Sequence, residues 1–118
     1  MIPRSRLPTR RRAETLTARV AGHKLHLTLG YYADGRLGEV FIDLHKVGSF
    51  SRGMLHSLAR LLSCALQYGV PADVLASMLA GTDFEPAGKV TGVPGVSRAK
   101  SIVDLVAQVI SAAGSRVT

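Results

Sequence analysis

The residues able to do covalent or metal chemistry are few and lie far apart in the sequence. Cys64 is the one cysteine among 118 residues, and the four histidines are His23, His26, His45 and His56. A nucleophilic cysteine needs a base beside it, whereas Cys64 stands next to an apolar helical stripe, as small buried hydrophobes do. A single cysteine also excludes an internal disulfide framework and a cysteine-rich metal cluster. We therefore expect no catalytic residues, no metal and no cofactor, and we predict that the protein is not an enzyme.

Two further hypotheses for chemistry stay open. His26 and His45 fall at polar positions of predicted strands, where they could form a pH-sensitive pair or a weak metal site. The other hypothesis is an independent enzyme that uses the Cys64 thiol, and the substitution Cys64→Ser would test it.

The charge balance indicates the kind of partner. The chain carries 15 Lys and Arg against 8 Asp and Glu, a formal net charge of +7. This surplus favours polyanions, either nucleic acid or an acidic protein surface. We find no aromatic residues at stacking spacing near the basic positions, which favours contact with a duplex backbone over reading of a single strand.

Five arginines are concentrated in residues 1–12, which hold two prolines and no acid. This composition predicts a flexible arm that follows phosphates, or alternatively a solvated, poorly ordered terminus. The residues predicted to contact nucleic acid are Arg4, Arg6, Arg10, Arg11 and Arg12 from the arm, with Arg19, Lys24 and Lys46 from the sheet.

Three segments alternate apolar and polar residues with the period of two that marks half-buried strands: residues 14–20, 24–31 and 37–45. Asp34-Gly35 separates the second from the third and is a strong hairpin signal, because both central positions of a type I′ turn need a positive φ. The pattern therefore predicts an antiparallel meander with one apolar face.

Helical periodicity follows the meander. A long helix should begin after the corner at 46–51, capped by Ser49 or Ser51, and end before Gly69 and Pro71. We expect it to be the centre of the core, with an inward stripe and an outward polar face. The inward stripe is Met54, Leu55, Leu58, Leu61, Leu62, Ala65 and Leu66, and the outward face is Arg52, His56, Arg60, Ser63 and Gln67. Shorter helices are predicted at about 71–80 and, capped by Ser97, at 97–113.

The expected fold is α+β: a three-stranded antiparallel meander followed by three helices packed on one face (βββααα), forming one domain at residues 13–118 after the arm. The loop at 82–96 is long for a connector, so it is either functional or packed on the body. We predict that Asp83, Glu85 and Lys89 in this loop contact a partner protein. Two open sheet edges would favour a homodimer.

Several segments, in this order, resemble a known family: LPTRRR, AGHKLHLTLGYYADGRLGEVFIDLHKVG, LSCALQYGVP, FEPAGKVTG and AKSIVDLVAQVI. Together they are similar to the C-terminal TSCPD-type domain of adenosylcobalamin-dependent ribonucleotide reductases, over residues 6–110. In those reductases the domain follows a large barrel that carries the cobalamin, the substrate and the radical cysteine. The resemblance thus implies the fold and a binding role.

Two departures bear on activity. The name of the domain comes from a cysteine-containing motif near its end, and residues 88–97, where we place that region, contain no cysteine. The reductases also use a cysteine pair to re-reduce the active site, which Cys64 alone cannot supply.

We therefore predict a stand-alone, non-catalytic binding or regulatory protein that contacts nucleic acid through its basic arm. The alternative is a detached accessory subunit of a B12-dependent ribonucleotide reductase that acts through protein contact. The single cysteine and the lack of any membrane-length apolar run lead us to expect a cytoplasmic protein.

Overall fold

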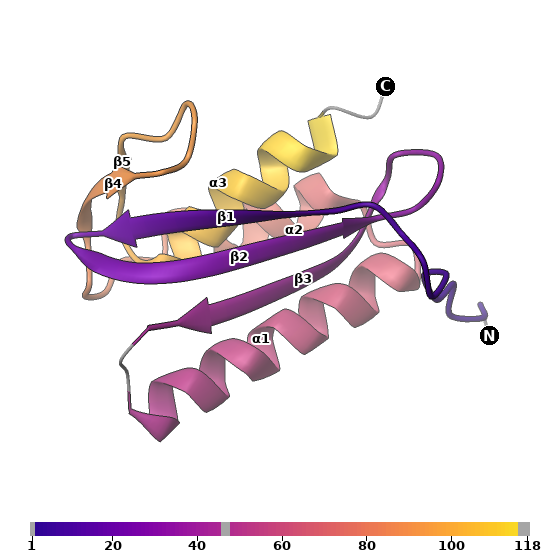
Figure 1. Ribbon diagram of the computed structural model, residues 1–118, viewed down its shortest axis with the longest axis horizontal. Helices are drawn as coiled ribbons and strands as arrows, with labels where there is room; N and C mark the ends of the chain where they lie inside the picture. Colours follow the sequence, from indigo (N-terminus) through magenta and orange to yellow (C-terminus); the bar gives the residue numbers. More distant parts are fainter. Residues whose placement is uncertain (1, 46–47, 116–118) are drawn as a thin grey trace.

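The structure is a computed structural model that describes residues 2–45 and 48–115 (Figure 1). Three antiparallel strands come first, β1 (Ala13–Val20), β2 (His23–Tyr31) and β3 (Leu37–Leu44). The helices α1 (Ser49–Gln67), α2 (Ala72–Leu79) and α3 (Ile102–Ser115) follow, with two short strands, β4 (Gly88–Thr91) and β5 (Arg98–Ala99), between α2 and α3. The α+β class and the meander followed by helices are confirmed.

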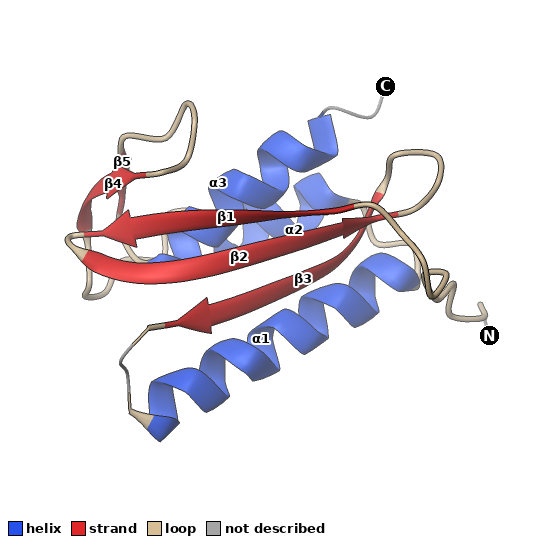
Figure 2. Ribbon diagram, viewed as in Figure 1, coloured by secondary structure: helices blue, strands red, loops and turns tan. Residues whose placement is uncertain are grey.

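The strands β4 and β5 were not predicted, and they correct the expected order to βββααββα. They extend the sheet to five strands in the order β3-β2-β1-β4-β5 (Figure 2). Arg19 and Val20 of β1 pair with Thr91 and Val90 of β4. Because β4 and β5 are only 4 and 2 residues long and are joined by a Gly- and Pro-containing turn, the period of two was too brief to separate them from loop.

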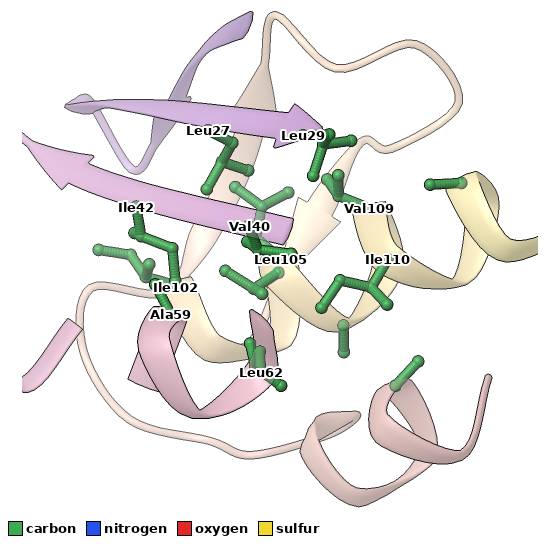
Figure 3. Packing of buried hydrophobic residues seen from close by; sticks show 14 of the residues in the cluster. Leu27, Leu29, Val40, Ile42, Ala59, Leu62, Ile102, Leu105, Val109 and Ile110 are labelled. Carbon is green, nitrogen blue, oxygen red and sulfur yellow. The ribbon is translucent and has the colours of Figure 1, made fainter. Parts of the chain in front are cut away.

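The core lies between the inner face of the sheet and α3 (Figure 3). Leu27, Leu29 and Ile42 from the strands are fully buried, as are Leu105 and Ile110 from α3. The expectation that the long helix α1 is the centre of the core was wrong. The shorter helix α3 has that place, because its more continuously apolar sequence can be covered on nearly all sides.

Helix α1 lies along β3 and presents polar side chains to that edge strand (Figure 1). The Ser63 hydroxyl accepts a hydrogen bond from Val40 N–H (2.9 Å) and donates to Val40 O (3.1 Å). Gln67 Nε2 donates to Gly38 O (3.0 Å). An edge strand has unpaired backbone groups that need partners when they are buried, so polar residues belong at this contact.

The predicted faces of α1 were therefore wrong in part. Ser63 and Gln67 are buried, whereas Leu61 is 69% and Met54 is 57% exposed. The homodimer was predicted from open sheet edges, but α1 covers the β3 edge, and β4 and β5 extend the sheet on the other side of β1. The β3 edge is therefore covered, whereas β1 pairs with β4 only at Arg19 and Val20, and the homodimer stays a prediction.

Both predicted helix caps also need correction. Helix α1 begins after Gly48, and no side-chain cap hydrogen bond is formed there. Helix α3 is capped by Ser101 rather than Ser97: Ser101 Oγ accepts the Asp104 N–H (2.9 Å), and the Asp104 carboxylate accepts the Lys100 N–H (2.9 Å). Ser101 therefore caps the helix, while Asp104 binds the backbone of the residue before the cap rather than that of Ser101, as it would in a capping box.

Candidate nucleic-acid interface

The basic arm, residues 2–12, lies against the body at the end of the sheet and the C-terminal end of α1 (Figure 1). Ser5 N–H donates to Gln67 O (2.9 Å), and Tyr31 N–H donates to Arg12 O (2.9 Å). The Tyr32 hydroxyl donates to Ser5 O. The backbone of the arm is thus attached near both of its ends, while its flexibility in solution stays a prediction.

Two of the arm's arginines are engaged by the protein itself. Arg11 forms a bidentate ion pair with Glu39, with Nε on Oε1 and Nη2 at 3.0 Å from Oε2, and Arg11 Nη1 also donates to Pro8 O (3.0 Å). The hydrogen bond to Glu39 raises the pKa of Arg11 above its usual value. Arg4 Nε donates to Gln67 Oε1 (2.8 Å). These two guanidinium groups therefore hold the arm on the body.

The remaining arm arginines are more accessible. The guanidinium of Arg12 lies over the Tyr31 ring, 5.1 Å from its centroid, in a cation–π contact. Arg6 and Arg10 are exposed. Of the five arginines predicted to contact nucleic acid, Arg6 and Arg10 are thus the most available to an external anion.

The sheet-side residues form a second group at the other end of β1. Arg19 lies seven residues beyond Arg12, which corresponds to about 23 Å along an extended strand. Arg19 is directly opposite Lys24 in the β1–β2 register. The His45 N–H donates to Lys24 O (3.1 Å), which continues the row onto the end of β3. Lys46, the eighth predicted residue, lies outside the described residues.

Strands β4 and β5 extend this row. Thr91 is opposite Arg19, so the outward face of β4 also carries Lys89, two residues earlier. Lys89 is in turn opposite Arg98 of β5. Lys89 was predicted to contact a partner protein, and Arg98 was not identified. The alternation Lys89-Val90-Thr91 is the signal in the sequence that could have placed them on a strand.

We call this set the cationic strip: His45, Lys24, Arg19, Lys89 and Arg98. Among the described residues, none of its lysines or arginines forms an ion pair with a carboxylate. The carboxylate in the neighbouring row, Asp43, faces His56, with 3.7 Å between Oδ1 and Nε2. Like charges directly opposite one another across strands destabilise a sheet, and Arg19 and Lys24 form such a pair. A bound anion would relieve this repulsion, so the strip favours anion binding.

Among the described residues, no three His, Cys, Asp or Glu side chains gather where they could hold a metal ion. His26 Nδ1 is 3.0 Å from Thr17 Oγ1, one row away from His45. The half-buried Cys64 has no hydrogen bond from its Sγ to a base among the described residues. Within 2–45 and 48–115, no helix is long and apolar enough to span a membrane.

The other predicted partner residues, Asp83 and Glu85, are exposed in the loop before β4. Asp83 borders a shallow depression of about 420 Å³ that is also lined by Arg98, Lys100 and Asp104. Asp104 is occupied by structural contacts, because Gly81 N–H (2.8 Å) and Lys100 N–H donate to it, and these bonds lower its pKa. Asp83 therefore lies near Arg98 of the cationic strip, and no described contact places Glu85 there.

Comparison with known proteins gives one consistent result. A family model described as TSCPD domain matches residues 2–113. The chain is 46% identical over 103 residues to a vitamin B12-dependent ribonucleotide reductase of Agrobacterium fabrum, which covers 87% of this chain and 8% of that protein. It is 46% identical to the reductase of the same name from Bradyrhizobium diazoefficiens, covering 90% of this chain and 8% of that protein. It is 43% identical to the reductase of the same name from Rhodopirellula baltica, and that match covers 89% of this chain and 10% of that protein. The chain thus spans a tenth or less of these relatives, and no solved structure matches it.

Proposed function

The chain belongs to the TSCPD domain family, and we propose that it is a non-catalytic binding module that holds the backbone of duplex nucleic acid against the outer face of its sheet. The observation that carries this proposal is the cationic strip. Four lysines and arginines lie on the outer face of neighbouring strands without a carboxylate partner among the described residues.

The dimensions of the strip suit a phosphate backbone. Adjacent strands are about 4.8 Å apart, so a row that crosses five strands is about 19 Å wide. Double-stranded DNA carries a phosphate every 3.4 Å of axis on each strand, and several phosphates therefore fall within reach of the row. Such contacts position a duplex without reading its sequence.

The arm supplies a second contact in this proposal. Arg6 and Arg10 lie at the opposite end of β1 from Arg19. The arm end of β1, at Arg12, is about 23 Å from Arg19 along the strand, so the arm would contact phosphates beyond those bound by the strip. The strip is the main anchor, because two of the arm's cations already bind Glu39 and Gln67.

The test is fluorescence anisotropy with a labelled duplex over a salt series. Four phosphate contacts predict a slope of log K against log salt of about −3.6. The variants Arg19→Gln, Lys24→Gln and Lys89→Gln should each make the slope shallower by about 0.9. Arg36→Gln is the matched control, because Arg36 pairs with Asp34 in the β2–β3 turn, away from the strip. A wild-type slope in all three strip variants, or no binding at low salt, refutes the proposal.

A second candidate function follows from the comparisons. The relatives described above are named as reductases, and this chain matches only a small part of each. In this second proposal the chain is an accessory subunit that binds such an enzyme through protein contact. Asp83 and Glu85 are the exposed acids that we assign to this contact. The test adds the chain to a B12-dependent reductase and measures nucleotide reduction. Unchanged turnover at saturating protein refutes this role, and turnover by the chain alone refutes the non-catalytic proposal.

A further inference from the structure

Strand β4 covers only one end of the edge of β1 that faces away from β2 (Figure 2). The Tyr31 N–H donates to Arg12 O (2.9 Å), so Arg12 directs its backbone groups toward β2. Because successive residues of a strand direct these groups to opposite sides, the even-numbered residues of β1 bond β2 and the odd-numbered ones face the other way. On that other side, β4 pairs with β1 only from Arg19 onward.

We call this side of residues 13–17 the open edge of β1. Among the residues that the structure describes, none forms a hydrogen bond with the backbone N–H or C=O of Ala13 or Thr15. The open edge ends at Thr17, where Gly92 lies so close that an added Cβ would overlap Thr17 O. About 17 Å of strand is therefore left, and unpaired backbone groups along an edge are a template for a further strand.

The hydrophobic core is also incompletely covered at the open edge. Leu16, Leu27 and Ile42 form one row across β1, β2 and β3 on the inner face of the sheet. Leu27 and Ile42 are each 1% exposed, whereas Leu16 is only half-buried. A strand added beside β1 would cover Leu16 as the neighbouring strands cover Leu27. One added strand would thus supply both the hydrogen bonds and the apolar cover that the open edge lacks.

A second copy of β1 does not fit the open edge. In the antiparallel register that keeps it clear of β4, Glu14 would lie directly beside Glu14 of the other copy, and like charges in that position are unfavourable. A register shifted toward Arg19 would place the second strand where Thr91 lies. The occupant that fits is therefore a segment of another protein that ends or turns beside Thr17.

The arm of a second copy is disfavoured for a different reason. It would bring five arginines and no acid next to Arg19, which has no ion pair with a carboxylate among the described residues. Like charges so close together repel one another.

We propose that the open edge of β1 binds an extended segment of a partner protein as an added antiparallel strand, with hydroxyl side chains beside Thr15 and apolar side chains beside Leu16. In this β-strand addition, backbone hydrogen bonds supply the affinity and alternate side chains supply the selectivity. The antiparallel direction matches both existing neighbours of β1. The backbone groups of the open edge are not part of the cationic strip, so the proposal does not depend on nucleic-acid binding.

The test uses two labelled eight-residue peptides that alternate Thr and Val. With Val beside Leu16, each Thr N–H would point toward β1 and each Val N–H away from it. One peptide is N-methylated at every Val and the other at every Thr. Fluorescence anisotropy should show binding of the Val-methylated peptide and at least about tenfold weaker binding of the Thr-methylated one. The amides of Ala13 and Thr15 should exchange hydrogen rapidly in the free chain and slowly in the complex.

Thr15→Pro removes one N–H of the open edge and should weaken binding of the Val-methylated peptide at least about tenfold. Thr15→Val is the matched control, because it keeps the N–H and should leave the affinity unchanged. Circular dichroism verifies the fold of Thr15→Pro, and the two peptides test the open edge without any substitution in the chain.

Four results overturn the proposal: equal binding of the two peptides, binding of neither, unchanged affinity in folded Thr15→Pro, or slow exchange at Ala13 and Thr15 in the free chain. Sedimentation of the chain alone tests the other occupant. A dimer that Thr15→Pro dissociates means that a second copy takes the open edge, which also overturns the proposal.

Discussion

Replacing Ser63 by Ala should destabilise the protein although it removes a single oxygen atom. The Ser63 hydroxyl is the hydrogen-bond partner of both Val40 N–H and Val40 O at the edge of β3, and Ser63 is buried. Alanine cannot replace either bond, and α1 covers the strand so that water has poor access. The backbone groups of Val40 would therefore be left buried without a partner.

The magnitude follows from two opposing effects. An unsatisfied buried donor or acceptor costs about 1–3 kcal/mol, whereas Ser→Ala within a helix gains up to about 0.5 kcal/mol of helix propensity. We expect the free energy of unfolding to fall by about 1.5–2 kcal/mol. For a chain of this size, that corresponds to a melting temperature lower by about 6–8 °C.

Urea unfolding followed by circular dichroism measures the effect, with an unchanged m-value as the sign that the unfolded state is unaffected. Ser57→Ala is the matched control, because Ser57 is an exposed serine in the same helix. It should stabilise the protein by up to about 0.5 kcal/mol. Ser63→Thr keeps the hydroxyl and should recover part of the loss. If Ser63→Ala and Ser57→Ala have the same stability, the contact between α1 and the β3 edge does not contribute as argued.

Three further predictions follow from the described contacts. The N–H groups of Lys100 and Gly81 lower the pKa of Asp104. The ionised Asp104 carboxylate therefore stabilises the fold fully above about pH 4, and this stabilisation is lost as the pH falls through the lowered pKa. The decline in unfolding free energy below pH 4 should accordingly be shallower in Asp104→Asn, as urea titrations at several pH values would measure. Gly30→Ala should speed tryptic cleavage of the arm, because a Cβ at Gly30 would overlap Glu39, which holds Arg11. Gly53→Ala, by contrast, has open space around it in the exposed part of α1, and thermal unfolding should show a gain of up to about 1 kcal/mol.

Periodicity predicted the existence of α1 but not its orientation. Its sequence has apolar residues around most of the helix, so two different stripes fit a period of 3.6. We assigned Ser63 and Gln67 to solvent because polar residues are usually exposed. In the structure they are buried, because an edge strand offers backbone groups that only polar side chains can bind. The sequence does not indicate that a helix will pack on an edge rather than on a face.

The cap of α3 was missed for a different reason. A serine followed three residues later by an acid is a signal visible in the sequence, and Ser101 with Asp104 has it. Helical periodicity alone favours Ser97, because the apolar stripe of the helix begins at Ala99.

The candidate interface shows why net charge alone does not locate a site. The count of +7 treats every arginine alike, yet Arg11 is held by a carboxylate whose side chain is only 10% exposed. A polyanion that drew Arg11 away would leave Glu39 without its cation in a nearly buried place, which is unfavourable. Arg11 should therefore add nothing to the salt dependence of binding. The slope should stay at about −3.6 for the four contacts of the strip, or reach about −5.4 if Arg6 and Arg10 join it. Arg11→Gln should loosen the arm and leave this slope unchanged.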